Sequence, residues 1–339
     1  RDRSIIYQMN NDDIKHLNDI SYGYWKAQAL FVANELDLFT LIGEQRMSSK
    51  VITKKLGTDP RATEMLLNAL VSLKLLSKSR DIFGNTAISK RCLSKKGPAY
   101  QGDRIKHFHN MWEYWSGLGT AVKSGKPTAF YNSKKGVDKQ RLREFISAMH
   151  NTATVQADEL YTKLQIKERS RLLDLAGGQG SYSVKFAKKN RNLKAVVFDL
   201  PDVIKLTRDH IKESSMTGQV TTKAGNCLED NLGKELYDIV LVSHLLHAYD
   251  ASENQKILKK CWDSLVKDGI VVIQEFILNP SKTMPLFGTL FSLNMLMGTQ
   301  GGSSYSAVEM QEWLKKAGFK KLRRIDLSMD SGLIIGSKL

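Results

Sequence analysis

The sequence predicts an α/β protein in which a largely parallel sheet, closed by an antiparallel hairpin, follows a helical winged-helix domain. In the second half of the chain, apolar segments alternate with helical stretches, which is typical of a parallel sheet with right-handed crossovers. The last two apolar segments are separated only by a turn, and this spacing predicts a terminal hairpin. The expected strands are 171–175, 193–199, 237–243, 269–277, 322–326 and 333–337.

The most informative of these segments is 172–180, Leu-Leu-Asp-Leu-Ala-Gly-Gly-Gln-Gly, which predicts a buried strand ending in a glycine turn. Glycines let the backbone approach a ligand closely, and the helix that follows offers free N–H groups at its N-terminus. The next apolar strand ends at Asp199, 19 residues after Gly180. A carboxylate at that place can accept both hydroxyls of a ribose. The pattern therefore predicts a site for a nucleoside cofactor.

The spacing of polar residues around the turn indicates which nucleoside. Ser183 stands where the third glycine of a dinucleotide fingerprint would lie, and the lysine of a phosphate-binding P-loop is missing. Asp174 precedes the first glycine by three residues. An acid there suits a ligand with an ammonium and a sulfonium, so S-adenosylmethionine is the expected cofactor. A nucleoside-binding parallel sheet closed by a hairpin is the Rossmann-like class I methyltransferase architecture.

Three helical segments and a hairpin precede this sheet and predict a winged-helix arrangement. The hairpin is expected to turn at Gly84 and Asn85. The third helix offers almost no basic residues beyond Arg61 and Lys74, whereas a DNA-recognition helix needs side chains for phosphates and bases. We therefore expect it to pack against a second subunit in a homodimer, and we do not expect nucleic acid as a partner. The segments are 24–42, 48–56, 60–76 and 79–93.

Composition agrees with a globular protein of two or more domains. Of 339 residues, 42% are apolar and 25% charged, and no apolar run reaches the roughly 18 residues of a membrane span. The three cysteines, Cys92, Cys227 and Cys261, support neither a disulfide framework nor a zinc site, and no metal is expected. A polar N-terminus without a signal-peptide pattern favours the cytoplasm. The net charge of +16 lies mostly in residues 1–200, with 34 Lys/Arg against 19 Asp/Glu, which permits either an anionic partner or simple solubility.

The segment between the two domains is helical in pattern and rich in aromatic residues. We expect a dimerisation domain at 1–100, a helical connector at 101–165 and a cofactor-binding domain at 166–339. Side chains of the connector, and of an apolar lid at 284–298, are candidates for the wall around an aromatic substrate. They are Trp115, Phe130, Tyr131, Phe145 and Met149 in the connector, and Phe287, Phe291 and Met295 in the lid.

Candidate catalytic groups follow the ends of two neighbouring strands. His247 comes shortly after 237–243, in the zone where open α/β sheets gather their catalytic groups, and its imidazole could accept the proton of a phenol. Glu275 ends the next strand and could hold the histidine in one tautomer. Glu309, at the start of a later helix, is a second candidate for that role.

At these residues the chain resembles the two-domain plant-type small-molecule O-methyltransferases, typified by the caffeic acid and hydroxyindole enzymes. The resemblance spans most of the chain. It rests on the glycine turn, on Phe198-Asp199-Leu200-Pro201, on Leu246-His247, on Glu275, and on Val308-Glu309 before Ala317-Gly318-Phe319.

The resemblance implies that His247 is the general base, flanked by Glu275 and Glu309, and that Met149 contacts the acceptor. Trp115, His107, Phe287, Phe291 and Met295 are the other expected acceptor contacts. S-adenosylmethionine, which leaves as S-adenosylhomocysteine, is expected to contact Asp174, Gly177, Gly178, Gly180, Asp199, Leu200, Asn226, Cys227 and Ser243.

The chain departs from the family pattern at several of these places. Asn226 stands where an acid usually contacts the adenine, and Ser243 stands where a lysine is common. The histidine is followed by Ala248-Tyr249 rather than Asp-Trp. These changes bear on the acceptor more than on the cofactor.

Two other functions remain open from the sequence. The chain also resembles the bacteriochlorophyllide ring methyltransferase, so the acceptor could be a ring carbon of a tetrapyrrole, with His107, His109 or His150 as a magnesium ligand. The fold could also serve a non-catalytic cofactor sensor that binds DNA, although the apolar third helix speaks against that use.

Overall fold

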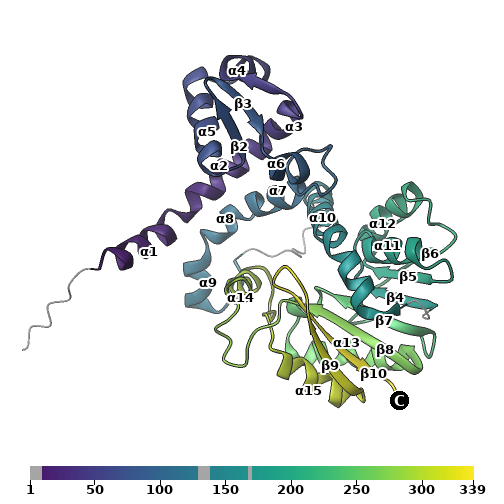
Figure 1. Ribbon diagram of the computed structural model, residues 1–339. Helices are drawn as coiled ribbons and strands as arrows, with labels where there is room; N and C mark the ends of the chain where they lie inside the picture. Colours follow the sequence, from purple (N-terminus) through teal and green to yellow (C-terminus); the bar gives the residue numbers. More distant parts are fainter. Residues whose placement is uncertain (1–9, 129–137, 167–169) are drawn as a thin grey trace, which may run out of the picture. The chain divides into compact units, whose positions relative to one another are not determined.

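A computed structural model describes residues 10–128, 138–166 and 170–339. The chain divides into two compact units, Arg1–His109 and Asn110–Leu339 (Figure 1). Phe130 and Tyr131, expected to help form the substrate wall, lie outside the described residues. In the part of the chain that the structure covers, none of the helices is long and apolar enough to cross a bilayer.

The first unit is a winged-helix domain. Its small antiparallel sheet has the strand order β1-β3-β2, with the helices packed around it. Asp59 caps the N-terminus of α5 through a bond from the Ala62 amide, and Pro60 occupies the first helical position, where its fixed φ suits a helix start. The elements are α1 Asn11–Ser21, α2 Gly23–Glu35, α3 Leu38–Ile42, β1 Arg46–Ser48, α4 Ser49–Leu56, α5 Pro60–Ser72, β2 Leu76–Ser79, β3 Ile82–Asn85, α6 Ala87–Cys92 and α7 Gly102–Asn110.

The expected hairpin of this unit is present but turns at a different place. Strands β2 and β3 pair Ser79 with Ile82, so the chain turns at Arg80 and Asp81. Gly84 and Asn85 lie inside β3, because the Arg46 side chain covers the Gly84 face and the Asn85 amide donates to two carbonyls of the α3 region. Residues 87–92, expected as the second strand, form α6 instead.

The second unit contains the large sheet and the helices around it. Its elements are α8 Trp112–Trp115, α9 Leu118–Ser124, α10 Lys139–Leu164, β4 Arg171–Leu175, α11 Ser181–Lys189, β5 Lys194–Asp199, α12 Pro201–Glu213, β6 Val220–Ala224, β7 Tyr237–Ser243, the 3₁₀ turn η2 Leu246–Ala248, α13 Ala251–Ser264, β8 Leu265–Glu275, α14 Leu286–Gly298, α15 Ala307–Ala317, β9 Lys320–Asp326 and β10 Gly332–Ser337.

The seven strands follow the order β6-β5-β4-β7-β8-β10-β9 (Figure 1). Strands β4 to β8 pair in parallel, and β10 enters antiparallel between β8 and β9. This is the hairpin-closed sheet expected of a class I methyltransferase, and the fold prediction is confirmed.

The strand pleat divides the core into two layers on opposite faces of the sheet. Successive residues of a strand point to opposite faces, so odd and even positions belong to different clusters. Leu173, Val240 and Val271 pack with residues of α13 and α15. Leu172 and Val272 pack with residues of α10, α11 and α12. Burial on both faces explains why these strands read as continuous apolar runs.

The strands differ from those expected by one missed strand and by the boundaries of four others. The sequence reasoning placed no strand at β6, Val220–Ala224, whose pattern Val-Thr-Thr-Lys-Ala is only partly buried because β6 lies at the sheet edge. Strand β8 begins at Leu265 rather than 269, because Leu265 already pairs with Tyr237 of β7 ahead of a register shift in the pairing.

Candidate active site

Most of the expected functional residues come together at one edge of the large sheet. Asp199 ends β5 and pairs with Ala224 of β6, while Ser243 ends β7 and pairs with Gln274 of β8. Because these strands are parallel, the segments that follow them emerge at the same edge, where open α/β sheets bind ligands (Figure 1).

The glycine turn after β4 has close contacts and backbone angles that favour glycine. A Cβ built on Gly177 would lie 2.6 Å from Cγ of Asp174, so a side chain at 177 would displace that carboxyl group. Gly178 and Gly180 have φ values of +58° and +74°, in the left-handed region that glycine adopts without penalty. Gly180 then serves as the N-cap of α11, whose first N–H groups therefore lie beside the turn.

Asp174 is a buried carboxylate with one oxygen free for a ligand. Its Oδ2 accepts from the Ser183 hydroxyl at 2.7 Å. Its Oδ1 has no hydrogen-bond partner among the described residues. Burial raises the pKa of Asp174 to about 6. A buried, half-satisfied carboxylate beside a glycine turn is suited to a cationic group such as the ammonium of an amino acid.

Asp199, at the end of β5, accepts hydrogen bonds from two backbone amides, one of which belongs to the glycine turn. Its Oδ2 accepts from the Gly178 amide at 2.8 Å and its Oδ1 from the Leu200 amide at 2.7 Å. Burial raises the pKa of Asp199, although these two amides favour the ionised form. Each carboxylate oxygen has a second lone pair, so both can still accept a hydroxyl.

Three polar side chains that the sequence reasoning missed brace the glycine turn from the helices. Thr207 on α12 donates its hydroxyl to the Gly178 carbonyl at 2.6 Å, and His210 on the same helix places Nδ1 2.9 Å from the Gln179 carbonyl. His150 on α10 places Nδ1 2.7 Å from the Ser181 hydroxyl. Burial, with a smaller contribution from His210, lowers the pKa of His150 to about 4, so its ring is neutral near pH 7. Only the packing of α10 and α12 on the turn brings these residues there.

The remaining expected cofactor contacts lie after β6 and β7, each with contacts of its own. The side-chain Oδ1 of Asn226 accepts from the backbone N–H of Leu228, and the backbone N–H of Asn226 donates to the carboxylate of Asp230. Cys227 is buried, with Sγ 3.5 Å from the Tyr249 hydroxyl. The Ser243 hydroxyl donates to Oε1 of Gln274 at 2.9 Å. These hydrogen bonds of Asn226 thus stabilise the loop in which it lies.

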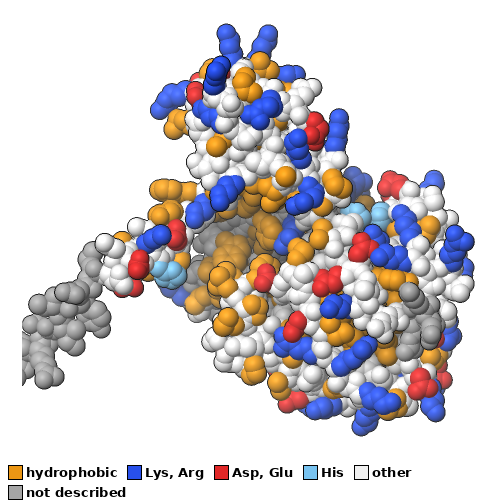
Figure 2. Space-filling model, viewed as in Figure 1, with side chains coloured by type: hydrophobic (Ala, Val, Ile, Leu, Met, Phe, Trp, Pro, Cys, Tyr) orange, Lys and Arg blue, Asp and Glu red, His pale blue; other side chains and the backbone are white. Residues whose placement is uncertain are grey.

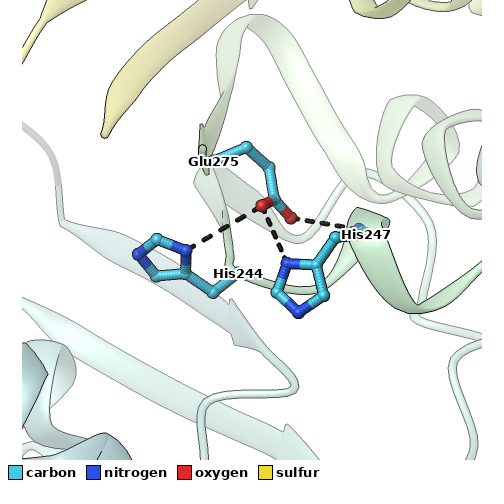
Figure 3. Close-up of side chains that lie close together, drawn as sticks. All are labelled: His244, His247 and Glu275. Carbon is cyan, nitrogen blue, oxygen red and sulfur yellow. Dashed lines mark hydrogen bonds and ion pairs between the residues drawn. The ribbon is translucent and has the colours of Figure 1, made fainter. Parts of the chain in front are cut away.

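His247 and Glu275 form a close pair (Figure 3). Nδ1 of His247 lies 2.8 Å from Oε2 of Glu275, and the His247 amide donates to Oε1 at 3.2 Å. Burial of Glu275 opposes its ionisation, but His247 and His244 outweigh it and hold the pKa of Glu275 below its usual value. An ionised carboxylate only accepts, so Nδ1 carries the proton and Nε2 presents a lone pair.

His244, which the sequence reasoning passed over, points at the same carboxylate (Figure 3). Its Nδ1 lies 3.8 Å from Oε2 of Glu275, and its φ of +51° is uncommon for a residue with a side chain. The motif Ser-His-Leu-Leu-His carries a signal for this pairing, since both histidines follow the same strand end.

Glu309 has structural contacts of its own, and its expected role beside His247 stays a prediction. It is the third residue of α15, where its Oε2 accepts from the amide and hydroxyl of Ser306 in a capping box. Its Oε1 pairs with Lys282 at 2.6 Å. Within the described residues, the Glu309 carboxylate has no hydrogen bond or ion pair with His247. The capping sequence Ser-x-x-Glu explains this arrangement.

Phenylalanine rings surround His247. Phe291 meets the His247 ring edge to face with centroids 4.9 Å apart, and Phe276 lies 4.8 Å from both Phe291 and Phe287. Phe287, Phe291 and the buried Met295 come from α14, as the apolar lid was expected to supply. Phe276 follows Glu275 directly, and the sequence reasoning did not include it.

The other expected acceptor contacts lie on separate elements. Trp115 is the last residue of α8, which packs against α14, and α14 in turn packs against η2. Met149 lies half-buried on α10, one residue before His150. His107 lies on α7 of the first unit, and its role toward the acceptor stays a prediction.

Comparison with known proteins gives the family. The model of the O-methyltransferase domain matches residues 115–320, and that of the O-methyltransferase dimerisation domain matches residues 18–95. The chain belongs to the O-methyltransferase family. It is an S-adenosylmethionine-dependent methyltransferase, and the expectations for family, enzyme class and cofactor are confirmed.

Similar proteins span nearly the whole chain of this O-methyltransferase. A 3-hydroxy-5-methyl-1-naphthoate 3-O-methyltransferase of Streptomyces sahachiroi is 30% identical, over 95% of this chain and 94% of its own. The tetracenomycin polyketide synthesis 8-O-methyl transferase of Streptomyces glaucescens is 28% identical, over 96% of both chains. The fold matches human N-acetylserotonin methyltransferase, crystallised with the cofactor, with a TM-score of 0.88, 23% identity, and coverage of 98% and 99% of the two chains.

The residues of the sheet edge fit this cofactor. The free Oδ1 of Asp174 suits an ammonium, the bare turn at Gly177 and Gly178 leaves room for close approach, and Asp199 retains lone pairs for ribose hydroxyls. The three groups lie on adjacent strand ends of β4 and β5.

Proposed function

We propose that this O-methyltransferase methylates a phenolic hydroxyl of a flat, apolar aromatic acceptor, with His247 as the general base. The observation that carries the proposal is the 2.8 Å contact between Nδ1 of His247 and the buried carboxylate of Glu275, beside a cluster of phenylalanine rings. A carboxylate that fixes one ring nitrogen as a donor leaves the other nitrogen able to accept a proton.

His247 is proposed to act while the new bond forms. The acceptor O–H bond breaks as its proton passes to Nε2 of His247, which leaves the oxygen an electron pair for the methyl group. Bound S-adenosylmethionine would supply that methyl with loss of its methyl–sulfur bond. The imidazolium so formed lies 2.8 Å from Glu275, which stabilises its positive charge. A positioned general base contributes typically 10²- to 10⁴-fold to a rate. Glu275 is a positioning residue in this scheme.

The cofactor is proposed to lie along the ends of β4 to β7. Asp174 would hold its ammonium, Asp199 its ribose hydroxyls, and the turn at Gly177, Gly178 and Gly180 its amino-acid portion. Leu200, Asn226, Cys227 and Ser243 are proposed as the other contacts. When bound, S-adenosylmethionine supplies an electrophilic methyl group and leaves as S-adenosylhomocysteine.

The acceptor is proposed to bind against the phenylalanine cluster of Phe276, Phe287 and Phe291. Aromatic rings prefer edge-to-face and offset contacts, and the three rings with His247 already adopt such angles, which suits a flat apolar ring system. Met295, Trp115 and Met149 are proposed as further contacts. The names of the two bacterial relatives, one acting on a naphthoate and one in tetracenomycin synthesis, favour acceptors of this kind.

We also propose a homodimer formed through the first unit and a cytoplasmic setting. The dimerisation-domain match over residues 18–95 supports the dimer. Nucleic acid stays an improbable partner. On the visible face of the second unit, Lys and Arg are interspersed with acidic side chains rather than gathered into a stripe (Figure 2).

The test is transfer of labelled methyl from S-adenosylmethionine to a panel of naphthols, monocyclic phenols, hydroxyindoles and chlorins. We expect label on the hydroxyl of the naphthols, with lower efficiency for monocyclic phenols because they cover less of the phenylalanine cluster. Label on a ring carbon of a chlorin would instead establish the tetrapyrrole function. No transfer to any acceptor, together with salt-dependent DNA binding, would support the non-catalytic sensor.

A further inference from the structure

His244, His247 and Glu275 form a cluster with one more histidine than a general base and its positioning carboxylate require. One ligand atom from each residue lies within 4.8 Å of the other two. Over residues 10–128, 138–166 and 170–339, this is the only group of three His, Cys, Asp or Glu side chains arranged so closely. Glu275 alone suffices to orient His247, so the approach of a second imidazole to the same carboxylate needs a separate explanation.

The second imidazole is directed there by the backbone. His244 has a φ of +51°, a left-handed conformation that histidine adopts more readily than most residues with a side chain. Its ring lies 4.5 Å from that of Phe276, and its Nδ1 faces Oε2 of Glu275 (Figure 3). Side chains of both histidines are about 15% exposed, so small solutes can reach them.

We propose that His244, His247 and Glu275 bind a divalent transition-metal ion, Zn²⁺ in particular, and that the bound ion inhibits methyl transfer. Two imidazoles and one carboxylate are a common set of protein ligands for this ion, and they leave a fourth position for water. The site offers one carboxylate and two imidazole nitrogens that face it.

The spacing of the ligand atoms agrees with this ion. Bonds of 2.0–2.1 Å in a tetrahedron place ligand atoms about 3.3 Å apart. The two distances to Oε2 of Glu275 are 2.8 Å for His247 and 3.8 Å for His244, one below and one above that value. All three ligand atoms lie within 4.8 Å of one another, so the two imidazoles would have to rotate toward a common point to bind the ion.

Metal binding and the proposed catalytic role of His247 exclude each other. Coordination through Nδ1 releases the proton that now bonds Glu275, and a dication beside the ring opposes transfer of another proton to Nε2. The inhibition rests on the proposed function, whereas the binding of metal does not. The two statements are tested separately for that reason.

Binding is tested on the full chain with Co²⁺ and Zn²⁺, without cofactor or acceptor. We expect the wild-type protein to give the intense visible absorption of tetrahedral Co²⁺, with one equivalent displaced by Zn²⁺. His244→Asn removes one ligand and suits the left-handed backbone, so it should weaken Zn²⁺ binding at least tenfold. The matched control is His16→Asn, a change at an exposed histidine of α1, which should leave binding unchanged. Equal binding by wild type and His244→Asn, or no binding by either, would overturn the site.

Inhibition is then measured by titrating Zn²⁺ into the methyl-transfer assay, with each variant compared to its own metal-free rate. Half-inhibition of His244→Asn should require at least tenfold more Zn²⁺ than that of wild type. Zn²⁺ that binds through His244 without slowing transfer would overturn the inhibitory role. A protein that binds Co²⁺ at this cluster yet transfers no methyl would leave the metal site standing and overturn the proposed function instead.

Discussion

Asp199 and Asp174, at neighbouring strand ends, differ in how many of their carboxylate oxygens accept a hydrogen bond. Asp199 accepts from two backbone amides, whereas Asp174 accepts from one hydroxyl and keeps one buried oxygen without a partner. A buried carboxylate lacking a partner destabilises the folded chain unless a ligand supplies one. Asp174 is therefore the residue at which stability and cofactor binding oppose each other most clearly.

Because Asp174 is buried with an oxygen that lacks a partner, we expect its ionisation to make the stability of the folded chain depend on pH. The pKa of Asp174 is about 6 in the folded chain, above its unfolded value of 3.8. The folded state thus binds this proton more tightly, so the contribution of Asp174 to the free energy of unfolding falls as pH rises from about 4 to 6, by on the order of 3 kcal/mol. In Asp174→Asn this fall should be absent, while affinity for S-adenosylhomocysteine drops at least tenfold. Chemical denaturation of both proteins between pH 4 and 8 measures it, and parallel pH profiles would contradict the assignment.

The side chains that brace the glycine turn should act on cofactor affinity. Replacing the hydrogen bond of Thr207 or His210 removes about 0.5–1.5 kcal/mol, so Thr207→Val and His210→Leu should weaken cofactor binding by roughly 2- to 12-fold. Thr207→Ser and His210→Asn keep a donor near the same position and should restore most of the affinity. Turnover at saturating cofactor should change little in all four. Calorimetric titration separates these outcomes, and equal losses in the conservative and disruptive variants would show a purely structural role.

At the scale of elements, the glycine turn acts as one unit with β5 and α12. A Cβ on Gly180 would lie 3.0 Å from Cγ2 of Val197, and its φ of +74° already disfavours any side chain. Gly125, at the end of α9, has a similar φ of +65° but open space around it. Alanine substitutions at Gly180 and Gly125 therefore separate the energetic cost of the left-handed backbone from the cost of steric crowding at the glycine turn.

We expect Gly180→Ala to lower the free energy of unfolding by about 2–3 kcal/mol and to reduce cofactor affinity more than tenfold. Gly125→Ala should cost about 1–2 kcal/mol, the price of a left-handed alanine alone, with unchanged affinity. Thermal unfolding and cofactor titration of both variants check this. If Gly125→Ala also loses cofactor binding, the effect is general instability and not the turn.

The elements also show what the sequence determines locally and what it does not. Strands β4 and β7 were predicted to the residue because they are apolar runs bounded by turn signals. Strand β6 was missed because an edge strand needs little apolar burial. The turn at Arg80 was misplaced because Gly84-Asn85 is the stronger local signal, whereas pairing with β1 and β2 and contacts from Arg46 and the α3 region hold those two residues in a strand.

The same distinction applies to the site. His247, Glu275 and the glycine turn follow strand ends, so their positions could be read from the order of strands. His210 and His150 could not, since their contact with the turn depends on how α10 and α12 pack. Glu309 is part of the capping box of α15, so its place in the sequence fits both a helix cap and the predicted flank of His247.

At the scale of the whole molecule, the first unit leaves large apolar side chains in water. Leu17, Ile20 and Trp25 on α1 and α2 are 57%, 65% and 62% exposed. Such a patch on a dimerisation domain is suited to self-association.

We expect the protein to sediment as a dimer at micromolar concentration, and the double substitution Leu17→Asp, Ile20→Asp to give a folded monomer. The added charges would be buried at the contact, which costs several kcal/mol and shifts dissociation by at least a hundredfold. Lys15→Asp, an exposed change on the same helix, is the control for charge alone. Dimers that persist in the double variant would place the contact elsewhere.

The central claim is that His247, oriented by Glu275, removes the proton of the acceptor. It is tested most directly by the rate of methyl transfer at saturating substrates in wild type and His247→Gln, for two acceptors of the same ring size. One acceptor is an ordinary phenol, and the other carries a phenol already ionised at the assay pH. The account predicts that His247→Gln slows the ordinary phenol by about 10²- to 10⁴-fold and the ionised one less than tenfold. Equal losses for the two acceptors would contradict it, because a base is not needed where no proton has to leave.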